Sequence, residues 1–390
     1  MMMRVAAVTA HFPNPARPTD GRSAYRTLHS LSHKSTVKVF VPLAAYPSPL
    51  GILLHRDNMA NEFKPPADLD ASYIDYTALP LISRPVNGWM AGKTLQASVS
   101  DFAPDLILSY CLYPDAFAAL QIAQSLSIPL VAVGVGSDVH GRRGLFTAMH
   151  TRTVLRHANY LVTVSEDLRQ KAIEMGASSE RSRSVPNGCD PAVFHLRDRS
   201  AARTALGIDA ASDVVVYVGR MDVKKGLCEL VNAATQVHRE RPNLHVYLIG
   251  EGPDRAIIEK AIQVRGAQGF VHPMPGCSFD EVATWMAASD LVTLPSYMEG
   301  CPNVVLESLA CGRPVVATNV GGIPEIMNEE CGYLVPPRDS NALAKALSSA
   351  LDRSWNAEAI ATRNRRTWGD VANEMLEIFD LVLPRHPASR

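Results

Sequence analysis

The chain lacks an excess of charge of either sign. Its 390 residues include 38 basic and 39 acidic side chains, which gives a formal net charge of -1. This balance excludes a whole-protein field that attracts nucleic acid, and such binding would need a local basic patch. Charged residues make up 20% of the chain and hydrophobic residues 47%, a globular composition that argues against extensive disorder. We therefore expect a folded protein with no nucleic-acid partner.

Cysteine is sparse, and no long apolar run is present. The seven cysteines are scattered, odd in number, and form no Cys-x-x-Cys pair, so they indicate a reduced, cytoplasmic protein. No run approaches the roughly 18 apolar residues of a spanning helix. The apolar stretch around Val5 is too short for the core of a signal peptide. We expect a cytoplasmic protein that would meet a membrane only peripherally, at its inner face.

Several common catalytic motifs are missing as well. The segment Gly134-Val-Gly136-Ser-Asp-Val lacks the third glycine of a dinucleotide-binding fingerprint, which argues against a nicotinamide enzyme. No Gly-x-Ser-x-Gly elbow marks a serine hydrolase. Neither a His-Glu-x-x-His motif nor a Cys/His cluster supports a metal site. We expect no metal and no cofactor.

Short strand-like runs alternate with longer helix-like stretches in both halves of the chain. This alternation predicts an α/β protein of two Rossmann-like, doubly wound domains. Turn residues near 185–191 predict a connection, so the domains are placed at 1–195 and 196–369. An apolar helical stripe at 370–383 predicts a C-terminal helix that could pack back on the first domain. The expected strands are 5–9, 37–41, 106–108, 130–135, 161–164, 214–218, 244–249, 269–272, 291–294 and 314–317.

The most informative segment is Glu299-Gly-Cys-Pro-Asn-Val-Val-Leu-Glu307, which directly follows an apolar strand-like run. Loops after strands bind ligands in open α/β sheets. Pro302 suits the first helical position, and backbone N–H groups around Asn303 and Val304 would attract an anion. Glu299 is expected to face the ligand from the loop, with Glu307 further along the helix. One acid could bind a sugar and the other a ribose.

Six segments of the second half, in order, resemble the nucleotide-sugar domain of family 4 retaining glycosyltransferases. That family has two facing Rossmann-like domains around a central cleft, the GT-B fold. Shorter matches at 113–115, 136–138, 164–165 and 185–190 extend the resemblance over most of the chain. Within the family, it is most similar to bacterial enzymes that build cell-surface or exported polysaccharides, of the teichuronic-acid type. The six segments are 218–226, 249–253, 299–307, 309–316, 321–325 and 332–337.

The resemblance implies a role for each matching polar residue. Arg220 and Lys225 would bind the diphosphate, where a guanidinium fork and a point charge can take the place of a metal ion. Glu299 would contact the hydroxyls of the donor sugar, which completes the expected catalytic set. Glu307 would accept hydrogen bonds from the ribose. The remaining donor-binding candidates are Gly21, Gly219, Gly252, Asn303 and Val304.

Each of these residues also has a structural alternative. In isolation, Arg220 and Lys225 would be solvated surface charges, and Glu307 could pair with a neighbouring cation. Their joint occurrence at family spacing favours the functional interpretation. Gly252 fits a local turn as well as a phosphate loop. The loop that contains Gly21 fits a plain surface loop as well as a phosphate or sugar contact.

The first domain is expected to bind the acceptor. Many members of the family carry a His just before the segment 136–138 that approaches the reacting sugar, whereas this chain has Val135. Asp138 and His140 remain as weaker candidates beside the cleft, with a loop-capping Asp and an exposed His as alternatives. Because no carboxylate nucleophile is assured on the far face of the sugar, the family mechanism implied is same-face attack by the acceptor hydroxyl.

Basic and apolar residues interleave across 142–157, which includes Arg142, Arg143, Arg152 and Arg156. The pattern favours a core-facing stripe with a solvated basic face, and it also fits a helix lying on an anionic membrane. The expected partners are a nucleoside-diphosphate sugar as donor, a glycan or lipid-linked acceptor, and this peripheral membrane contact.

Three alternatives remain open at the level of sequence. Asp68-Leu-Asp70 matches the Asp-x-Asp that holds a metal in the other main glycosyltransferase fold, but it lies in a stretch that looks loop-like and strand-poor, so we interpret it as a coincidence. A nucleotide-sugar epimerase is the second enzyme to consider. A non-catalytic nucleotide-sugar-binding protein is the contrasting class.

Overall fold

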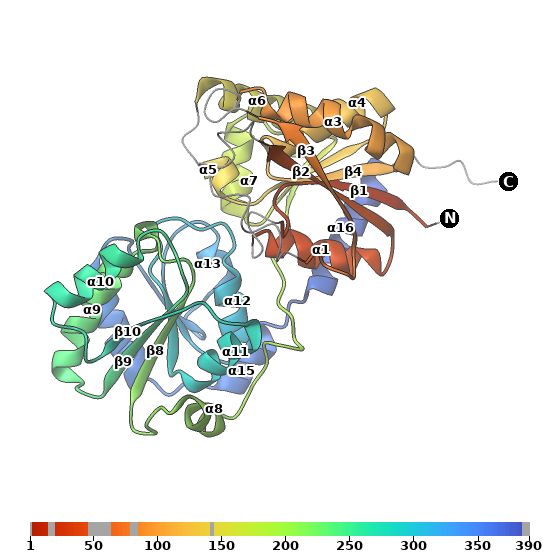
Figure 1. Cartoon of the computed structure of the whole chain (residues 1–390). Coiled ribbons are helices and arrows are strands. Elements are labelled where there is room, and N and C mark those ends of the chain that lie inside the picture. The colour runs from red at the N-terminus through yellow and green to blue at the C-terminus, as the bar shows by residue number, and fades with distance from the viewer. Residues whose placement is uncertain (1, 15–19, 46–63, 79–84, 141–143, 384–390) are drawn as a thin grey trace. The chain divides into compact units, whose positions relative to one another are not determined.

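The computed structural model describes residues 2–14, 20–45, 64–78, 85–140 and 144–383. It consists of two compact units, each built around a parallel β-sheet (Figure 1). Unit 1 comprises residues 1–187 with 368–390, and unit 2 comprises 188–367. The chain therefore passes from unit 1 to unit 2 after Asn187 and returns after Thr367. Two parallel α/β units confirm the predicted fold class.

Unit 1 contains a seven-stranded parallel sheet with the order β3-β2-β1-β4-β5-β6-β7. The order reverses between β1 and β4, the arrangement of a doubly wound sheet. The strands are β1 (Arg4–Val8), β2 (Thr36–Ala45), β3 (Asp70–Thr77), β4 (Leu106–Tyr110), β5 (Leu130–Gly134), β6 (Tyr160–Thr163) and β7 (Ser182–Ser184). The helices include α1 (Arg22–Ser32), α3 (Asn87–Phe102), α4 (Asp115–Leu126), α5 (Ser137–His140), α6 (Leu145–His157), α7 (Glu166–Glu174) and α16 (Trp368–Val382).

The strand β3 corrects the interpretation of the segment around Asp68. Far from being strand-poor, the segment leads directly into β3, which begins at Asp70 and pairs in parallel with β2. The Asp68 carboxylate accepts a hydrogen bond from the Tyr25 hydroxyl at 2.7 Å and lies 3.2 Å from Nε2 of His29. Asp68 therefore joins the start of β3 to α1.

The last helix, α16, belongs to unit 1 although the whole of unit 2 precedes it in sequence. It packs on α1, and its apolar side chains join the same buried cluster as those of β1 and β4. Met375, Ile378 and Phe379 are almost fully buried there. The apolar stripe that the sequence shows at 370–383 thus completes the core of unit 1.

Unit 2 contains a six-stranded parallel sheet with the order β10-β9-β8-β11-β12-β13, and the order reverses between β8 and β11. The strand β13 has no counterpart among the strands expected from the sequence. The strands are β8 (Asp213–Val218), β9 (Leu244–Ile249), β10 (Val271–Met274), β11 (Leu291–Leu294), β12 (Val315–Thr318) and β13 (Gly332–Val335). The helices include α8 (Arg199–Leu206), α9 (Leu227–Glu240), α10 (Arg255–Val264), α11 (Phe279–Ala288), α12 (Asn303–Ala310), α13 (Ile323–Ile326), α14 (Ser340–Asp352) and α15 (Ala357–Arg363).

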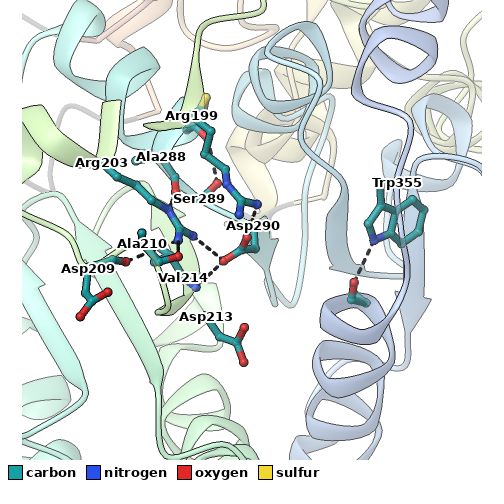
Figure 2. A network of polar contacts seen from close by, with 12 residues as sticks. Arg199, Arg203, Asp209, Ala210, Asp213, Val214, Ala288, Ser289, Asp290 and Trp355 are labelled. Carbon is teal, nitrogen blue, oxygen red and sulfur yellow. Dashed lines mark hydrogen bonds and ion pairs between the residues drawn. The ribbon is translucent and has the colours of Figure 1, made fainter. Parts of the chain in front are cut away.

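A partly buried ionic network fastens α8 to the amino ends of β8 and β11 (Figure 2). Arg203 and Arg199 both point at the carboxylate of Asp290, with N–O distances of 2.7 and 2.6 Å. Asp290 also accepts a hydrogen bond from the backbone N–H of Val214 at 2.7 Å. The guanidinium of Arg203 donates further bonds to the carbonyls of Ala288 and Ala210. This network lies at the edge of the sheet opposite to the loops that follow β8 and β11.

Within the described residues, no helix combines the length and the hydropathy that crossing a bilayer requires.

Candidate active site

The predicted donor-binding residues of unit 2 gather where the strand order reverses. Arg220 and Lys225 follow β8, whereas Glu299 and α12 follow β11. Since β8 and β11 are paired neighbours, with Val216 opposite Val292, these loops leave adjacent strands at the same edge of the sheet. An open α/β sheet binds its ligands at this edge.

Lys225 and Glu299 form the central ion pair of this edge. The ammonium Nζ of Lys225 lies 2.6 Å from Oε1 of Glu299, and their side chains are 28% and 10% exposed. Lys225 ends a short 3-10 turn whose start is fixed by Asp222, which accepts a bond from the N–H of Lys224 at 2.9 Å. A charge-assisted bond of this kind fixes both groups, so a cation and an acid are presented together.

Two glycines allow the loops to approach one another closely. Gly226 has a left-handed φ of +68°, and a Cβ at this position would lie 2.0 Å from the carbonyl oxygen of Pro295. A Cβ on Gly321 would lie 1.9 Å from the carbonyl oxygen of Glu299. No larger residue fits either position without moving the backbone. The two glycines therefore help to place the loops that carry Lys225 and Glu299.

A buried tyrosine, which was not expected from the sequence, fixes the backbone of Arg220. The Tyr217 hydroxyl donates to the carbonyl of Arg220 at 2.9 Å, and a Cβ on Gly219 would lie 2.8 Å from that hydroxyl. Burial, with the carboxylates of Glu299 and Asp222 nearby, raises the pKa of Tyr217. Among the described residues, no carboxylate pairs with the exposed guanidinium of Arg220. Arg220 is thus available to an anion.

Gly252 has a structural explanation. A Cβ there would lie 2.2 Å from the carbonyl oxygen of Met221, and the N–H of Met221 donates to the carbonyl of Glu251 at 2.9 Å. The loops after β8 and β9 therefore pack backbone against backbone. This favours the turn interpretation of Gly252, and the phosphate contact stays a prediction.

Helix α12 starts at Asn303, with Pro302 in the capping position. Pro302 thus precedes the helix, whereas the sequence analysis placed it at the first helical position. The start of α12 brings Asn303 and Val304 to the edge that carries Glu299, and the first turn of any helix directs backbone N–H groups outward. Glu307 lies one turn further and is only 6% exposed. A buried carboxylate on this helix fits a group that accepts bonds from a ligand hydroxyl.

The candidates in unit 1 have largely structural roles. Asp138 is buried and accepts bonds from the backbone N–H groups of Leu112, Val135 and Gly136 at 3.0, 2.9 and 2.8 Å. This is the loop-capping alternative of the sequence analysis. His140 ends α5, and its side chain lies outside the described residues.

Gly21 is likewise required by the backbone. It precedes α1 with a φ of +72°, and a Cβ at this position would lie 2.3 Å from the backbone N of Phe12. Close packing of Gly21 against the backbone of His11 and Phe12, in the loop after β1, explains the glycine without a ligand. A contact between Gly21 and a donor stays a prediction.

Asp115 belongs to the short matching segment 113–115, but it was not among the site residues expected from the sequence. It follows β4 next to β1, where the sheet of unit 1 reverses its order. The carboxylate accepts bonds from the N–H of Ala10 at 2.6 Å and from the hydroxyl of Thr9 at 3.3 Å, whereas Oδ1 has no partner among the described residues. Burial raises the pKa of Asp115 to about 7. It is a buried acid that can change charge near neutral pH.

Helix α6 is only partly core-facing. Val154 and Leu155 are buried, but Leu145, Phe146 and Met149 are 82%, 56% and 52% exposed. The core-stripe interpretation therefore accounts for the second half of the helix alone. Arg142 and Arg143 lie outside the described residues.

The helix α4 packs against both α6 and α3. The imidazole of His150 on α6 stacks on Tyr113 and contacts Phe117 of α4, and a Cβ on Gly88 of α3 would lie 2.9 Å from the Phe117 ring. Both α6 and α3 therefore lie against Phe117. On α3, Trp89 is 48% exposed.

In the part of the chain that the structure describes, no group of three or more His, Cys, Asp or Glu side chains is arranged to hold a metal ion.

Family models match both units. The model described as "Glycosyl transferase 4-like domain" matches residues 21–188, and the model described as "Glycosyl transferases group 1" matches residues 212–353. Together they span most of the chain.

Named relatives are similar to parts of the chain. It is 30% identical over 254 residues to TuaC of Bacillus subtilis, a proposed teichuronic acid biosynthesis glycosyltransferase, which covers 64% of this chain and 61% of TuaC. It is 32% identical over 237 residues to a D-inositol 3-phosphate glycosyltransferase of Rhodococcus jostii. This match covers 57% of this chain and 52% of the relative. The chain spans about half to three fifths of the length of these relatives.

Solved structures share the fold. A sucrose-phosphate synthase from Thermosynechococcus elongatus superposes with a TM-score of 0.80 at 21% identity, covering 97% of this chain and 98% of the other. HepE from Anabaena in complex with UDP-glucose gives a TM-score of 0.72 at 21% identity, and the match covers 98% of this chain and 100% of HepE.

Proposed function

Because this chain belongs to the family 4-type glycosyltransferases of the GT-B fold, we propose that it transfers a hexosyl group from a nucleoside-diphosphate sugar to an acceptor. The acceptor in this proposal is a glycan or a lipid-linked glycan in the synthesis of a cell-surface or exported polysaccharide. The observation that carries the proposal is the grouping of Arg220, Lys225 and Glu299 where β8 and β11 meet. The complexes of HepE with UDP and with UDP-glucose support a nucleotide-sugar donor.

In the proposed donor complex, the diphosphate lies between the two loops of unit 2. The guanidinium of Arg220 and the ammonium of Lys225 bind its oxygens, and the first turn of α12 faces the distal phosphate. Glu299, held 2.6 Å from Lys225, accepts bonds from hydroxyls of the transferred sugar. The buried carboxylate of Glu307 accepts bonds from the ribose.

The proposed reaction needs stabilisation of a leaving diphosphate. As the bond between the anomeric carbon and the phosphate oxygen breaks, negative charge grows on the diphosphate, where Arg220 and Lys225 stabilise it. The acceptor hydroxyl attacks the anomeric carbon from the same face and gives its proton to the departing phosphate oxygen. The new bond keeps the anomeric configuration of the donor. The two cations replace a metal ion in this scheme.

Release of nucleoside diphosphate tests the proposal. The protein is incubated in EDTA with UDP-, GDP- and ADP-hexoses and a panel of glycan acceptors, and product formation and anomeric configuration are followed by NMR. We expect one donor to be consumed only with acceptor present, with retained configuration. Arg220→Gln and Lys225→Met each lower kcat by about 100-fold, the usual effect of removing one stabilising group. Glu329→Ala, an exposed acid elsewhere in unit 2, serves as the control.

Other outcomes would contradict the proposal. An inverted product would exclude retention, and loss of activity in EDTA would exclude metal independence. A new nucleotide sugar formed without acceptor would identify an epimerase. Donor binding without any product over the whole panel would favour a non-catalytic binding protein.

We also propose that the exposed apolar side chains of α6, together with Trp89 of α3, dock on an anionic membrane. Leu145, Phe146 and Trp89 are exposed, and the exposed cations Arg152 and Arg156 lie further along α6. This combination is typical of interfacial helices. A lipid-linked acceptor would then be reached from the inner face of the membrane.

Co-sedimentation with vesicles tests the membrane contact. We expect binding to phosphatidylglycerol vesicles and little to phosphatidylcholine vesicles. The double variant Leu145→Ser, Phe146→Ser should bind at least about tenfold more weakly, because each exposed side chain can bury apolar area worth about 1.5 kcal/mol or more. Val264→Ser, which alters a 74% exposed side chain of unit 2, is the control. Equal binding by all variants would overturn the assignment of the surface.

A further inference from the structure

Unit 2 contains a polar groove that the proposed reaction does not use. It has a volume of about 680 Å³ and is lined by α9, the residue after α10, and the start of α14. Three arginines line it: Arg239 in the last turn of α9, Arg265 after α10, and Arg338 before α14. Helices α9 and α10 are neighbours (Figure 1).

The groove carries an excess of positive charge, although the chain as a whole has a formal net charge of only -1. Within the described residues, Arg239, Arg265 and Arg338 have no carboxylate partner. The acid that lines the groove, Asp339, is engaged with the start of α14, where its carboxylate accepts bonds from the N–H groups of Asn341 and Ala342 at 3.0 and 2.9 Å. Surface cations are ordinarily interspersed with acids, so three arginines that share a groove favour an anionic ligand.

Arg338 is held in an unusual conformation at one end of the groove. Its φ is +62°, a left-handed value that is uncommon for a residue with a side chain. Its guanidinium carbon lies 4.6 Å from the centre of the Tyr297 ring, a cation–π contact.

Tyr297 connects this end of the groove to the loops of the candidate active site. Its hydroxyl donates to Glu229 in the first turn of α9 at 2.7 Å, and its N–H donates to the carbonyl of Lys224 at 2.9 Å. Lys224 adjoins Lys225, and Tyr297 lies two residues before Glu299. A ligand that draws Arg338 away from Tyr297 would therefore act on the residue that joins both loops.

The lining specifies the chemistry of the ligand. Amide and hydroxyl groups of Asn232, Ser340 and Asn341 are suited to sugar hydroxyls, and the guanidinium groups to phosphate. The cations lie at both ends, because Arg338 contacts Tyr297 near the first turn of α9 whereas Arg239 is in its last turn. The residues of α9 that line the groove run from Asn232 to Arg239, which is about 10 Å along the helix axis.

We propose that this groove binds a phosphorylated sugar with two charged groups, and that its binding weakens nucleotide binding through Arg338 and Tyr297. The binding itself does not rest on the proposed transferase activity. The coupling does rest on the assignment of the nucleotide site in unit 2.

Calorimetric titration with fructose 1,6-bisphosphate tests the groove. We expect saturable binding at a single site, at least tenfold tighter than inorganic phosphate, and none with fructose. The double variant Arg239→Gln, Arg265→Gln should bind at least tenfold more weakly. Lys345→Gln, which removes an exposed charge from α14 outside the groove, should bind as the wild type does. Absence of binding, equal affinity for inorganic phosphate, or an unchanged double variant with intact melting temperature would each overturn the proposal.

A second titration tests the coupling. UDP is titrated into the protein with and without saturating bisphosphate, and we expect about fivefold weaker UDP binding in its presence. Arg338→Gln should abolish this difference. A difference that persists in Arg338→Gln, or none in the wild type, would overturn the coupling. If UDP does not bind at all, the donor-site assignment fails while the bisphosphate titration still decides the groove.

Discussion

At the scale of single residues, the candidate site depends on backbone positions as much as on charged side chains. Gly226 and Gly207 have nearly the same left-handed φ, +68° and +67°, but only Gly226 has backbone against the place of a Cβ. For Gly207, nothing lies within 4 Å of that place. Substitutions at these two glycines therefore separate the effect of a left-handed backbone from the effect of close contact with a neighbouring loop.

We predict that Gly226→Ala destabilises the protein by about 3 kcal/mol, because a Cβ 2.0 Å from the Pro295 oxygen forces the loops apart. Gly207→Ala should cost about 1 kcal/mol, the penalty of a left-handed residue alone. The midpoint of urea unfolding measures both. Equal losses would contradict the role assigned to the approach of the two loops.

Asp115 predicts a pH dependence with a definite sign. Its pKa is about 7 in the folded protein because of burial, whereas an unfolded Asp ionises near its usual pKa of about 4. Between these values the folded state holds the extra proton, so its stability falls as the pH rises from about 4 to about 7 and is level above that. Asp115→Asn should show a flatter profile over this window. The comparison is made by urea unfolding at pH 5 and pH 8, and parallel profiles for both proteins would exclude the effect.

The sequence marked the charged residues proposed for the site, but not the residues that support them. Lys225 and Glu299 stand in recognisable segments, and the structure brings them together from the loops after adjacent strands, while their roles in binding stay predictions. Tyr217 and Tyr297 carry no such mark, because each acts through a contact that only the folded chain creates. The hydroxyl of Tyr297 reaches Glu229, 68 residues away. The first residue of α12 was predicted one position too early, at Pro302, because a sequence without the cap geometry does not fix a helix start to one residue.

At the scale of elements, α8 is fixed by charge rather than by apolar packing alone. Asp290 faces two arginines and a backbone N–H, and Arg203 is almost completely buried (Figure 2). Removal of one partner from such a group leaves a charge in a place from which water is excluded.

We predict that Asp290→Ala lowers the free energy of unfolding by about 3 kcal/mol, because Arg203 loses its carboxylate and Val214 its acceptor. Asp280→Ala removes the acid that pairs with Arg197 but is 79% exposed, and should cost at most about 1 kcal/mol. Chemical denaturation followed by circular dichroism gives both values. A loss of less than 1 kcal/mol for Asp290→Ala would show that the network contributes little.

Strands with continuous apolar runs were predictable, even at four residues as in β11, whereas the half-exposed strands β3 and β13 were not. The strands β5 and β8 are buried along nearly their whole length, and their sequences show it. The strand β3 lies at the sheet edge with most residues partly exposed, so its sequence has no apolar run. The strand β13 has only four residues, two of them buried, and was recognised only as a family motif.

At the scale of the whole molecule, the chain leaves unit 1 once and returns to it. The amphipathic pattern of α16 indicated that a helix there needs a packing surface, but periodicity alone cannot say which surface. Its apolar residues join those of β1 and α1 in one cluster. A change in α16 is therefore expected to affect unit 1, although unit 2 is nearer in sequence.

At the meeting point of β8 and β11, unit 2 is proposed to bind a nucleoside diphosphate. Calorimetric titration of UDP, GDP and ADP into the full chain in EDTA tests it most directly, with wild type, Lys225→Met and Lys345→Gln compared. We predict that one nucleotide binds, that Lys225→Met weakens it at least about tenfold through loss of a charge-assisted bond, and that Lys345→Gln has no effect. Binding of none of the three, or equal affinity for wild type and folded Lys225→Met, would contradict the account.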